Sequence, residues 1–152
     1  MKNFRFILLP IVIVSLVSFC FAQKSGELDT FGYYYIVKPN KAFADISEIH
    51  LAGDYGQTQT PVFFGLIRLK NKRAKDFRLL KPFQKGNYIS FTTSAVNRIS
   101  YKFTGYFAPS FKEDLRSAIK PRTIVLEGKL LKYRGKVKIA EQLVKFTYFA
   151  GD

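Results

Sequence analysis

Residues with distinctive chemistry are scarce in this chain, which has one cysteine, one histidine and no tryptophan among 152 residues. The lone cysteine, Cys20, excludes a disulfide or a cysteine-ligated metal within the chain. A hydrolytic triad needs a base oriented by an acid beside a nucleophile, and His50 is the only imidazole present. A Gly-x-Ser-x-Gly elbow is also absent. The composition therefore gives no support for hydrolysis of that kind.

The amino-terminal 22 residues have the pattern of a secretory signal peptide. A short cationic start precedes an apolar run over residues 6–21, and the small residues Cys20 and Ala22 lie three and one before the expected cut. The run is shorter than the roughly 20 residues that span a bilayer, and Phe19 occupies the position where a lipoprotein signal has a small residue. We expect cleavage after Ala22, export to the periplasm or the extracellular space, and one β domain over residues 23–152 with no transmembrane segment.

Acidic residues are few, 11 against 25 lysines and arginines, which gives a formal net charge of +14 at pH 7. Residues 23–57 carry three basic and five acidic side chains, whereas residues 58–152 carry 20 basic and six acidic ones. Such an excess favours anionic partners, which include acidic glycans, anionic lipids and nucleic acids. The export signal argues against nucleic acid as a routine partner.

Apolar and polar residues alternate with a period of two through most of the chain, between turn signals such as Pro39-Asn40. This pattern, rich in aromatic and β-branched residues, is typical of antiparallel strands. One short helix is predicted near residues 110–119, because Ser110 and Glu113 match a capping box. Strands are predicted at residues 31–38, 46–52, 60–70, 87–93, 98–107, 122–133 and 136–149.

The sequence therefore predicts an all-β fold, a single antiparallel domain of about seven or eight strands. Long strands joined by next-neighbour hairpins favour a small calycin-like up-and-down barrel, with a β-sandwich as the second choice. Lipocalins resemble the chain in size and strand pattern, but their Gly-x-Trp motif near the first strand is absent. No family is assigned on this resemblance.

The last two predicted strands form a hairpin around Arg134-Gly135, a two-residue loop whose glycine suits a positive φ. Apolar residues change sides along the second strand between Ile139 and Val144. One extra residue near positions 140–142 restores the alignment by bringing Leu126 opposite Val144. A β-bulge is therefore predicted there.

A basic run after the apolar strand at residues 62–67 is the most distinctive surface feature. Such a run serves either as charged protection of a sheet edge or as a contact for an anionic glycan or lipid headgroup. The candidate patch for an anionic partner comprises Arg68, Lys70, Lys72, Arg73, Lys75 and Arg78.

Aromatic residues supply the second candidate site. Alternation places Tyr33 and Tyr35 on one face of a strand and Tyr34 on the other. Tyrosine rings and hydroxyls suit a sugar or lipid pocket, although packing in the core also accounts for them. The candidate pocket aromatics are Tyr33, Tyr35 and Phe63.

Metal chemistry finds little support. Glu48 and His50 lie two residues apart on a predicted strand and therefore share a face. That spacing is common by chance, and the simpler interpretation puts both in water with Ile49 and Leu51 in the core. We assign no catalytic residue, no cofactor and no metal ligand.

The leading hypothesis is a secreted or periplasmic non-catalytic binding module, with an interior or end pocket for an apolar or amphipathic ligand. The alternative is a structural or accessory protein of the envelope that binds an anionic glycan or lipid headgroup through a basic face. A third hypothesis is an enzyme that uses two carboxylates. Glu127 and Glu141 lie on opposite strands of the predicted hairpin, but they are expected to point outward among lysines.

Overall fold

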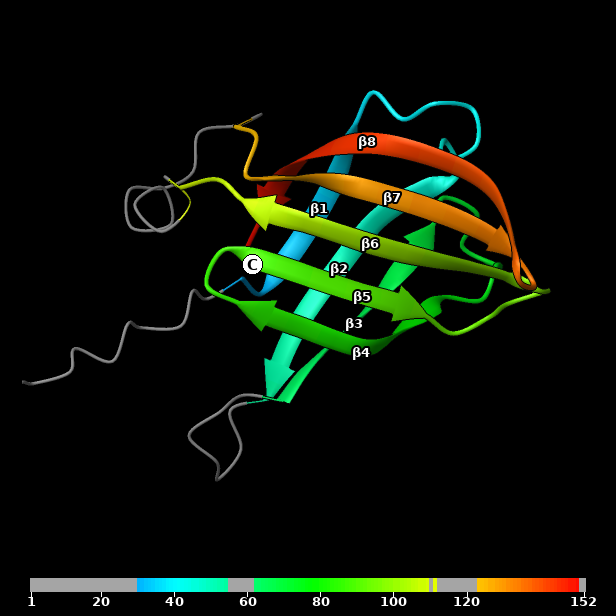
Figure 1. Ribbon diagram of the computed structural model, residues 1–152, viewed down its shortest axis with the longest axis horizontal. Helices are drawn as coiled ribbons and strands as arrows, with labels where there is room; N and C mark the ends of the chain where they lie inside the picture. Colours follow the sequence, from blue (N-terminus) through cyan, green and yellow to red (C-terminus); the bar gives the residue numbers. More distant parts are fainter. Residues whose placement is uncertain (1–29, 55–61, 110, 112–122, 151–152) are drawn as a thin grey trace, which may run out of the picture.

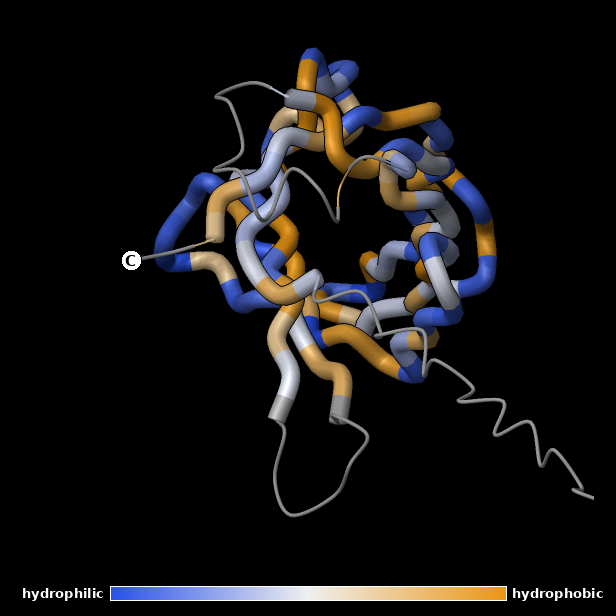
Figure 2. The backbone as a smooth tube through the Cα atoms, turned by 90° about the vertical axis from the view of Figure 1, so that its left-hand side faces the viewer, coloured by the Kyte–Doolittle hydropathy of each residue, from blue (hydrophilic) through white to orange (hydrophobic). Residues whose placement is uncertain are grey.

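The computed structural model describes residues 30–54, 62–109, 111 and 123–150, which contain eight antiparallel strands (Figure 1). Each strand pairs with the next one in the sequence, and β8 pairs with β1. The sheet therefore closes, and a view along the barrel shows a ring of backbone (Figure 2). The strands are β1 (Gly32–Val37), β2 (Ile46–Asp54), β3 (Val62–Leu69), β4 (Phe77–Lys85), β5 (Tyr88–Thr93), β6 (Ile99–Phe107), β7 (Leu126–Arg134) and β8 (Val137–Phe149).

The closed ladder between β1 and β8 confirms the predicted calycin-like up-and-down barrel. It runs from Tyr33 opposite Phe149 to Val37 opposite Lys145, so the β-sandwich alternative is wrong. The expected signal peptide lies outside the described residues, as does the helix predicted near 110–119, apart from Phe111. Within the described ranges, no helix is long and apolar enough to cross a membrane.

Alternation along β1 and β2 decides which side chains enter the barrel. Tyr34 is buried in the interior, whereas Tyr33 and Tyr35 lie on the outer face. On β2, Ile49 and Leu51 are buried in the core, as the sequence predicts. Each such burial contributes roughly 1.5–3 kcal/mol, and the barrel holds this core without a disulfide.

Aromatic rings occupy much of the interior. The Phe103 ring lies 5.3 Å from that of Phe91 and meets that of Phe146 edge-on at 5.5 Å between centroids. Phe107, from the far end of β6, packs against Tyr34 with centroids 6.0 Å apart. Rings from β1, β5, β6 and β8 thus meet inside the barrel and tie together strands that are not neighbours in the sheet.

Two glycines make room for the Phe103 ring. Gly105 on β6 and Gly128 on β7 are paired across the sheet. An ideal Cβ atom on these glycines would lie 2.5 Å and 2.6 Å from Phe103 Cζ, respectively. Both distances are far inside van der Waals contact, so the ring can cover this part of the wall only because neither residue has a side chain.

The β7–β8 hairpin turns one residue later than predicted. Arg134 pairs with Val137, so the two-residue loop is Gly135-Lys136, and the glycine has a φ of 61°. Leu126 pairs with Phe146, two residues beyond its predicted partner. The predicted loop and pairing are wrong, but the error of two residues leaves each of these side chains on its predicted face.

The predicted β-bulge on β8 exists at a different position. It lies at Ile139, where the register with β7 shifts between Lys132 and Tyr133, rather than at residues 140–142. Val137 and Ile139 are 65% and 44% exposed. The prediction failed because it placed these apolar residues in the core, whereas both are exposed near the turn of the hairpin.

Substituting Gly128→Ala is expected to lower the free energy of unfolding by about 2 kcal/mol, since overpacking costs about 1–3 kcal/mol. The new methyl group would press on the Thr104 carbonyl oxygen, 2.4 Å from the ideal Cβ position, as well as on the Phe103 ring. Urea unfolding followed by circular dichroism measures the change. Lys129→Ala, on the outer face of the same strand, is the control and should change stability by less than about 0.5 kcal/mol. Equal stability of the two variants would contradict the packing.

Candidate binding pocket at one mouth of the barrel

A pocket opens at the end of the barrel where β3, β5 and β7 finish and β2, β4 and β6 begin. Its volume is about 440 Å³, within the roughly 300–1,000 Å³ that is typical of small-molecule sites. We call it the mouth pocket. Its walls come from the turn before β2, the loop at residues 70–76, the turn between β5 and β6, and the end of β7.

The floor of the mouth pocket is apolar. Phe77 and Tyr101 are both buried and meet edge-on, with ring centroids 4.9 Å apart. Leu69, Val96 and Ile99 add aliphatic surface beside them. Burial raises the pKa of the Tyr101 phenol well above its usual value of 10, so this hydroxyl stays neutral.

The rim is predominantly cationic. Lys132 Nζ donates a hydrogen bond to the Ala42 carbonyl oxygen at 2.9 Å and lies 3.4 Å from a carboxylate oxygen of Asp45. The same ammonium group is 5.6 Å from the centre of the Tyr101 ring, within the range of a cation–π contact. Arg73 and Lys75 complete the charged rim. Three cations and one carboxylate therefore surround the apolar floor.

A tight turn fixes one wall of the pocket. Val96 and Ile99 exchange both backbone hydrogen bonds, each 2.9 Å long. Asn97 and Arg98 between them have φ values of 50° and 66°, the left-handed region that a two-residue type I′ turn requires at both positions. The amide of Gly135 donates to the Arg98 carbonyl oxygen at 2.7 Å, which ties this turn to the β7–β8 hairpin.

The loop at residues 70–76 owes its shape to Asn71. The Asn71 side-chain oxygen accepts a hydrogen bond from the Arg73 amide at 3.0 Å, and its carbonyl oxygen accepts one from Ala74 at 2.9 Å. Side chains of this kind stabilise turns by bonding to the backbone two residues on. At the start of the loop, the Lys70 amide donates to the Asp45 carbonyl oxygen at 2.9 Å. The loop that carries Arg73 and Lys75 is thus anchored to the adjacent turn before β2.

The structure divides the predicted basic patch. Arg73 and Lys75 lie on the rim of the mouth pocket, and Lys72 lies with Arg68 beside a neighbouring pocket of about 370 Å³. Arg68 is committed to ion pairs with Glu48 at 2.7 Å and Asp76 at 3.6 Å. The other two members, both exposed, are Lys70 and Arg78.

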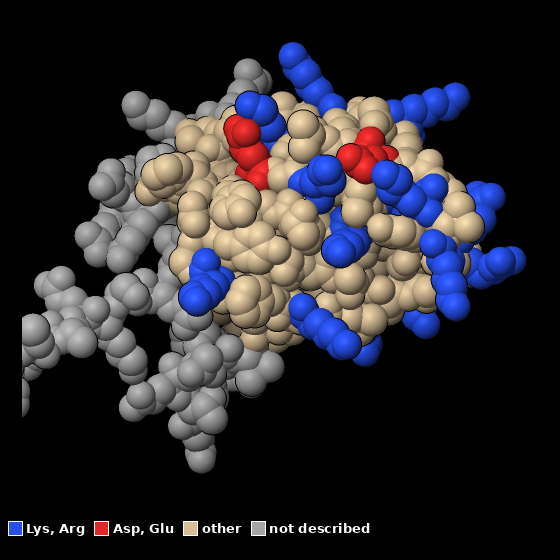
Figure 3. Space-filling model, in the orientation of Figure 1, with Lys and Arg blue, Asp and Glu red and all other residues tan. Residues whose placement is uncertain are grey.

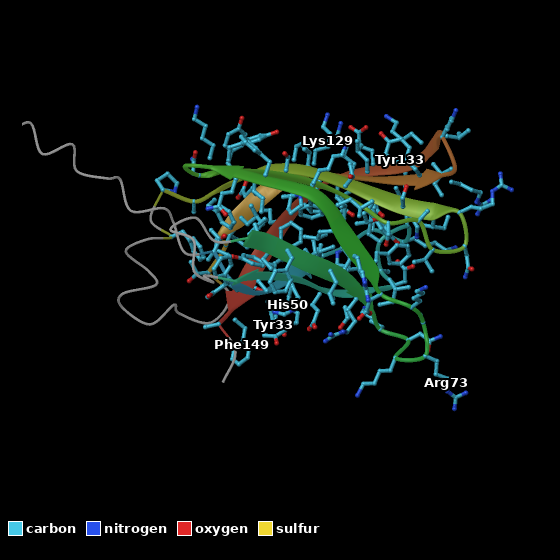
Figure 4. All side chains as sticks on the ribbon, turned by 90° about the horizontal axis from the view of Figure 1, so that it is seen from below. Tyr33, His50, Arg73, Lys129, Tyr133 and Phe149 are labelled. Carbon is cyan, nitrogen blue, oxygen red and sulfur yellow. The ribbon has the colours of Figure 1, made fainter. Side chains whose placement is uncertain are left out.

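The three candidate pocket aromatics do not come together. Tyr33 and Tyr35 lie on the outer surface of β1. The Tyr33 ring stacks on His50 with centroids 4.5 Å apart, and Phe149 lies beside it at 6.3 Å (Figure 4). Phe63 instead packs against the core and stacks on Phe31. Tyr33, Tyr35 and Phe63 therefore do not line a common interior pocket.

Glu48 and His50 share the outer face of β2, as predicted, but Glu48 is nearly buried there. The Arg68 guanidinium covers the carboxylate, and Glu48 in turn adds to burial in raising the pKa of Tyr35. Burial, with the positive charge of Arg68, lowers the pKa of His50 below 6.5. Among the residues whose placement is described, no three His, Cys, Asp or Glu side chains form a cluster suited to a metal ion.

Sequence reasoning missed Asp45, Asn97, Tyr101 and Lys132 as pocket residues. They come from separate turns and strands and share no local motif. The chain matches no family model, and comparisons with curated proteins and with solved structures found no significant match. The candidate site therefore depends on the geometry of this chain alone.

Replacing Arg68→Gln is expected to raise the pKa of His50, because a positive charge that disfavours the imidazolium is removed while Glu48 remains. As the only histidine, His50 gives one imidazole titration by NMR. Arg68→Lys keeps the charge and should keep the pKa low; an equal rise in both variants would contradict the electrostatic cause.

Since the pKa of His50 is lower in the folded state than in the unfolded one, the unfolded chain binds the proton first as the pH falls. The free energy of unfolding should therefore decrease as the pH drops below 6.5.

Proposed function

We propose that the protein is a non-catalytic binding module whose mouth pocket takes a small amphipathic anion, with an apolar body and one carboxylate or similar head. In the proposal the module works in the periplasm or outside the cell, after export and cleavage following Ala22. The observation that carries the proposal is the pairing of an apolar floor with a cationic rim in one pocket.

The two parts of the pocket suit the two parts of such a ligand. Leu69, Val96 and Ile99 are partly exposed and offer apolar surface to such a body, with the buried rings of Phe77 and Tyr101 behind them. Burial of the apolar body is favoured by roughly 25 cal/mol per Å². An anionic head left at the rim would meet Lys132, whose side chain is largely buried, and the exposed Arg73 and Lys75. Near Lys132 the setting is partly desolvated, and charge-assisted hydrogen bonds there are stronger than in bulk water. A neutral ligand would gain only the free energy of apolar burial.

The filled interior supports an end site rather than a central one. Phe91, Phe103 and Phe146 are buried and in contact inside the barrel. Their rings occupy space that a carrier of long apolar molecules would leave open. The ligand expected here is therefore short, with its apolar part held at the level of Tyr101.

The ion pairs of Glu127 and Glu141 argue against a catalytic role for these two carboxylates. Glu127 pairs with Lys145 at 2.9 Å, and Glu141 pairs with Lys138 at 2.7 Å and Lys129 at 3.3 Å, all on the outer surface. Hydrogen bonds from both lysines lower the pKa of Glu141. A general acid needs a raised pKa instead. These carboxylates therefore suit ordinary ion pairs with lysines on the solvent-facing surface.

A pair of fluorescent probes tests the pocket. The anionic probe 1-anilinonaphthalene-8-sulfonate should bind more tightly than N-phenyl-1-naphthylamine, which has the same rings and no charge. Lys132→Met should weaken binding of the anionic probe by about tenfold, since a hydrogen bond to a charged group contributes about 1.5–3 kcal/mol. It should leave the affinity for the neutral probe unchanged. Fluorescence titration measures both dissociation constants.

Two further variants keep this test decisive. Arg73→Gln with Lys75→Gln changes only exposed rim residues, so it reports on the pocket even if Lys132→Met fails to fold. Lys129→Met, on the outer face of β7, is the matched control and should bind both probes as the unmodified protein does. Unchanged binding of the anionic probe in both rim variants would overturn the proposal.

A further inference from the structure

The outer surface of β4, β5 and β6 combines exposed aromatic rings with unpaired positive charge. Phe83, Tyr88 and Tyr106 form a chain of tilted rings across the three strands, with centroids 6.2 Å and 5.3 Å apart. Phe83 is 52% exposed, Tyr106 is 58% exposed, and Leu80 on the same face is 47% exposed. Contiguous apolar surface of this kind marks an interaction site more often than scattered single residues do.

The register shows that these side chains share one face with lysines. Tyr88 lies opposite Lys85 on β4 and opposite Tyr106 on β6. Lys102 lies opposite Thr92, which in turn lies opposite Leu80. Lys81, at the irregularity of β4, is also exposed. We call this set the β4–β6 face; its members are Leu80, Lys81, Phe83, Lys85, Tyr88, Lys102 and Tyr106.

The β4–β6 face contains no acidic residue. From Phe77 to Phe107 the chain has five lysines and arginines and no aspartate or glutamate. Lys81, Lys85 and Lys102 form no ion pair with any residue that the structure describes. On the visible side of the molecule, the acidic side chains lie toward β7 and β8, and the charged side chains over β4–β6 are all lysines or arginines, drawn in blue (Figure 3). Three lysines without an acidic partner among the described residues thus lie beside the exposed rings.

We propose that the β4–β6 face is a docking surface for an anionic phospholipid bilayer. Aromatic rings settle at the level of the headgroups, leucine and phenylalanine enter the boundary of the acyl chains, and lysines are attracted to anionic headgroups. The face supplies all three in one layer. The protein would lie on the bilayer through its outer wall while the mouth pocket, at the end of the barrel, stays open to solution.

The geometry favours a bilayer over single-stranded nucleic acid. Base stacking needs an open ring face and a groove that follows the backbone. Here the rings of Phe83, Tyr88 and Tyr106 pack against one another at interplanar angles near 60°. They stand on the convex outer wall of a barrel, beside the aliphatic Leu80. A broad, fluid surface matches this shape better than a strand of bases.

Vesicle co-sedimentation tests the proposal with the full chain. The protein should sediment with phosphatidylcholine vesicles that contain about one third phosphatidylglycerol and far less with phosphatidylcholine alone, and added salt should release it. Lys85→Gln with Lys102→Gln should weaken binding by about thirtyfold, since one lysine near an anionic surface changes affinity by about fivefold. Phe83→Ser with Tyr106→Ser should weaken it by on the order of tenfold.

Matched controls lie outside the face. Lys41→Gln with Lys136→Gln removes the same charge from two exposed turns, and Leu143→Ser removes the most exposed apolar side chain, on β8. These variants should bind nearly as the unmodified protein does. Equal losses in the control variants and the β4–β6 variants would overturn the proposal, as would tighter binding of a single-stranded oligothymidylate that displaces the vesicles. Circular dichroism confirms that each variant is folded, and the probe titrations of the mouth pocket remain independent of the result.

Discussion

The contact of the Phe103 ring with the Gly105–Gly128 pair is the packing constraint on which the barrel depends. Because neither glycine has a side chain, the ring lies over the β6–β7 ladder and still reaches Phe146 on β8 and Phe91 on β5. These contacts link strands on both sides of β6 and β7. A chain with a single cysteine has no internal disulfide, so packing of apolar side chains, with these rings prominent among them, must supply the cross-barrel cohesion. The same rings occupy much of the interior, which supports the proposal of a site at the mouth rather than at the centre of the barrel.

Most of the fold prediction followed from the local alternation of apolar and polar residues. Residue spacing on β2 placed Ile49 and Leu51 in the core correctly, because a two-residue period is a property of any extended strand. On β1 the same period separated Tyr34 from Tyr33 and Tyr35, but it did not decide which of the two faces lies inside. The hairpin register was harder to predict. Val137 and Ile139 are apolar but exposed, so treating them as core residues gave the wrong alignment of β7 with β8. The correct register depends on where the barrel ends relative to the hairpin turn, which the local sequence does not show.

The candidate site was much less predictable than the fold. The basic run was visible in the sequence, but nothing local indicates that Arg68 is neutralised by Glu48 and Asp76 while Arg73 and Lys75 remain on a rim. Lys132 joins that rim from a strand about 60 residues away in sequence, brought there by barrel closure. Turn residues from distant segments meet only once all ladders are formed. The sequence therefore predicted an anionic partner and one basic run for it, but not the pocket that Arg73 and Lys75 form with Lys132.

Charge sorting explains why a net charge of +14 gives two distinct basic regions rather than a uniform one. Carboxylates on β2, β7 and β8 pair with lysines or arginines that are cross-strand neighbours, as in Glu127 with Lys145 and Glu48 with Arg68. Cross-strand pairs of opposite charge are weakly stabilising, and they use up cations on those strands. The cations left over lie on strands without acidic residues and on turns at the mouth. At the mouth Arg73 and Lys75 join Lys132, which is itself paired with Asp45, around an apolar floor. On β4–β6 three lysines lie beside exposed rings. Each region thus joins cationic side chains to apolar surface, and it is on this combination that both proposals of an anionic, partly apolar partner rest.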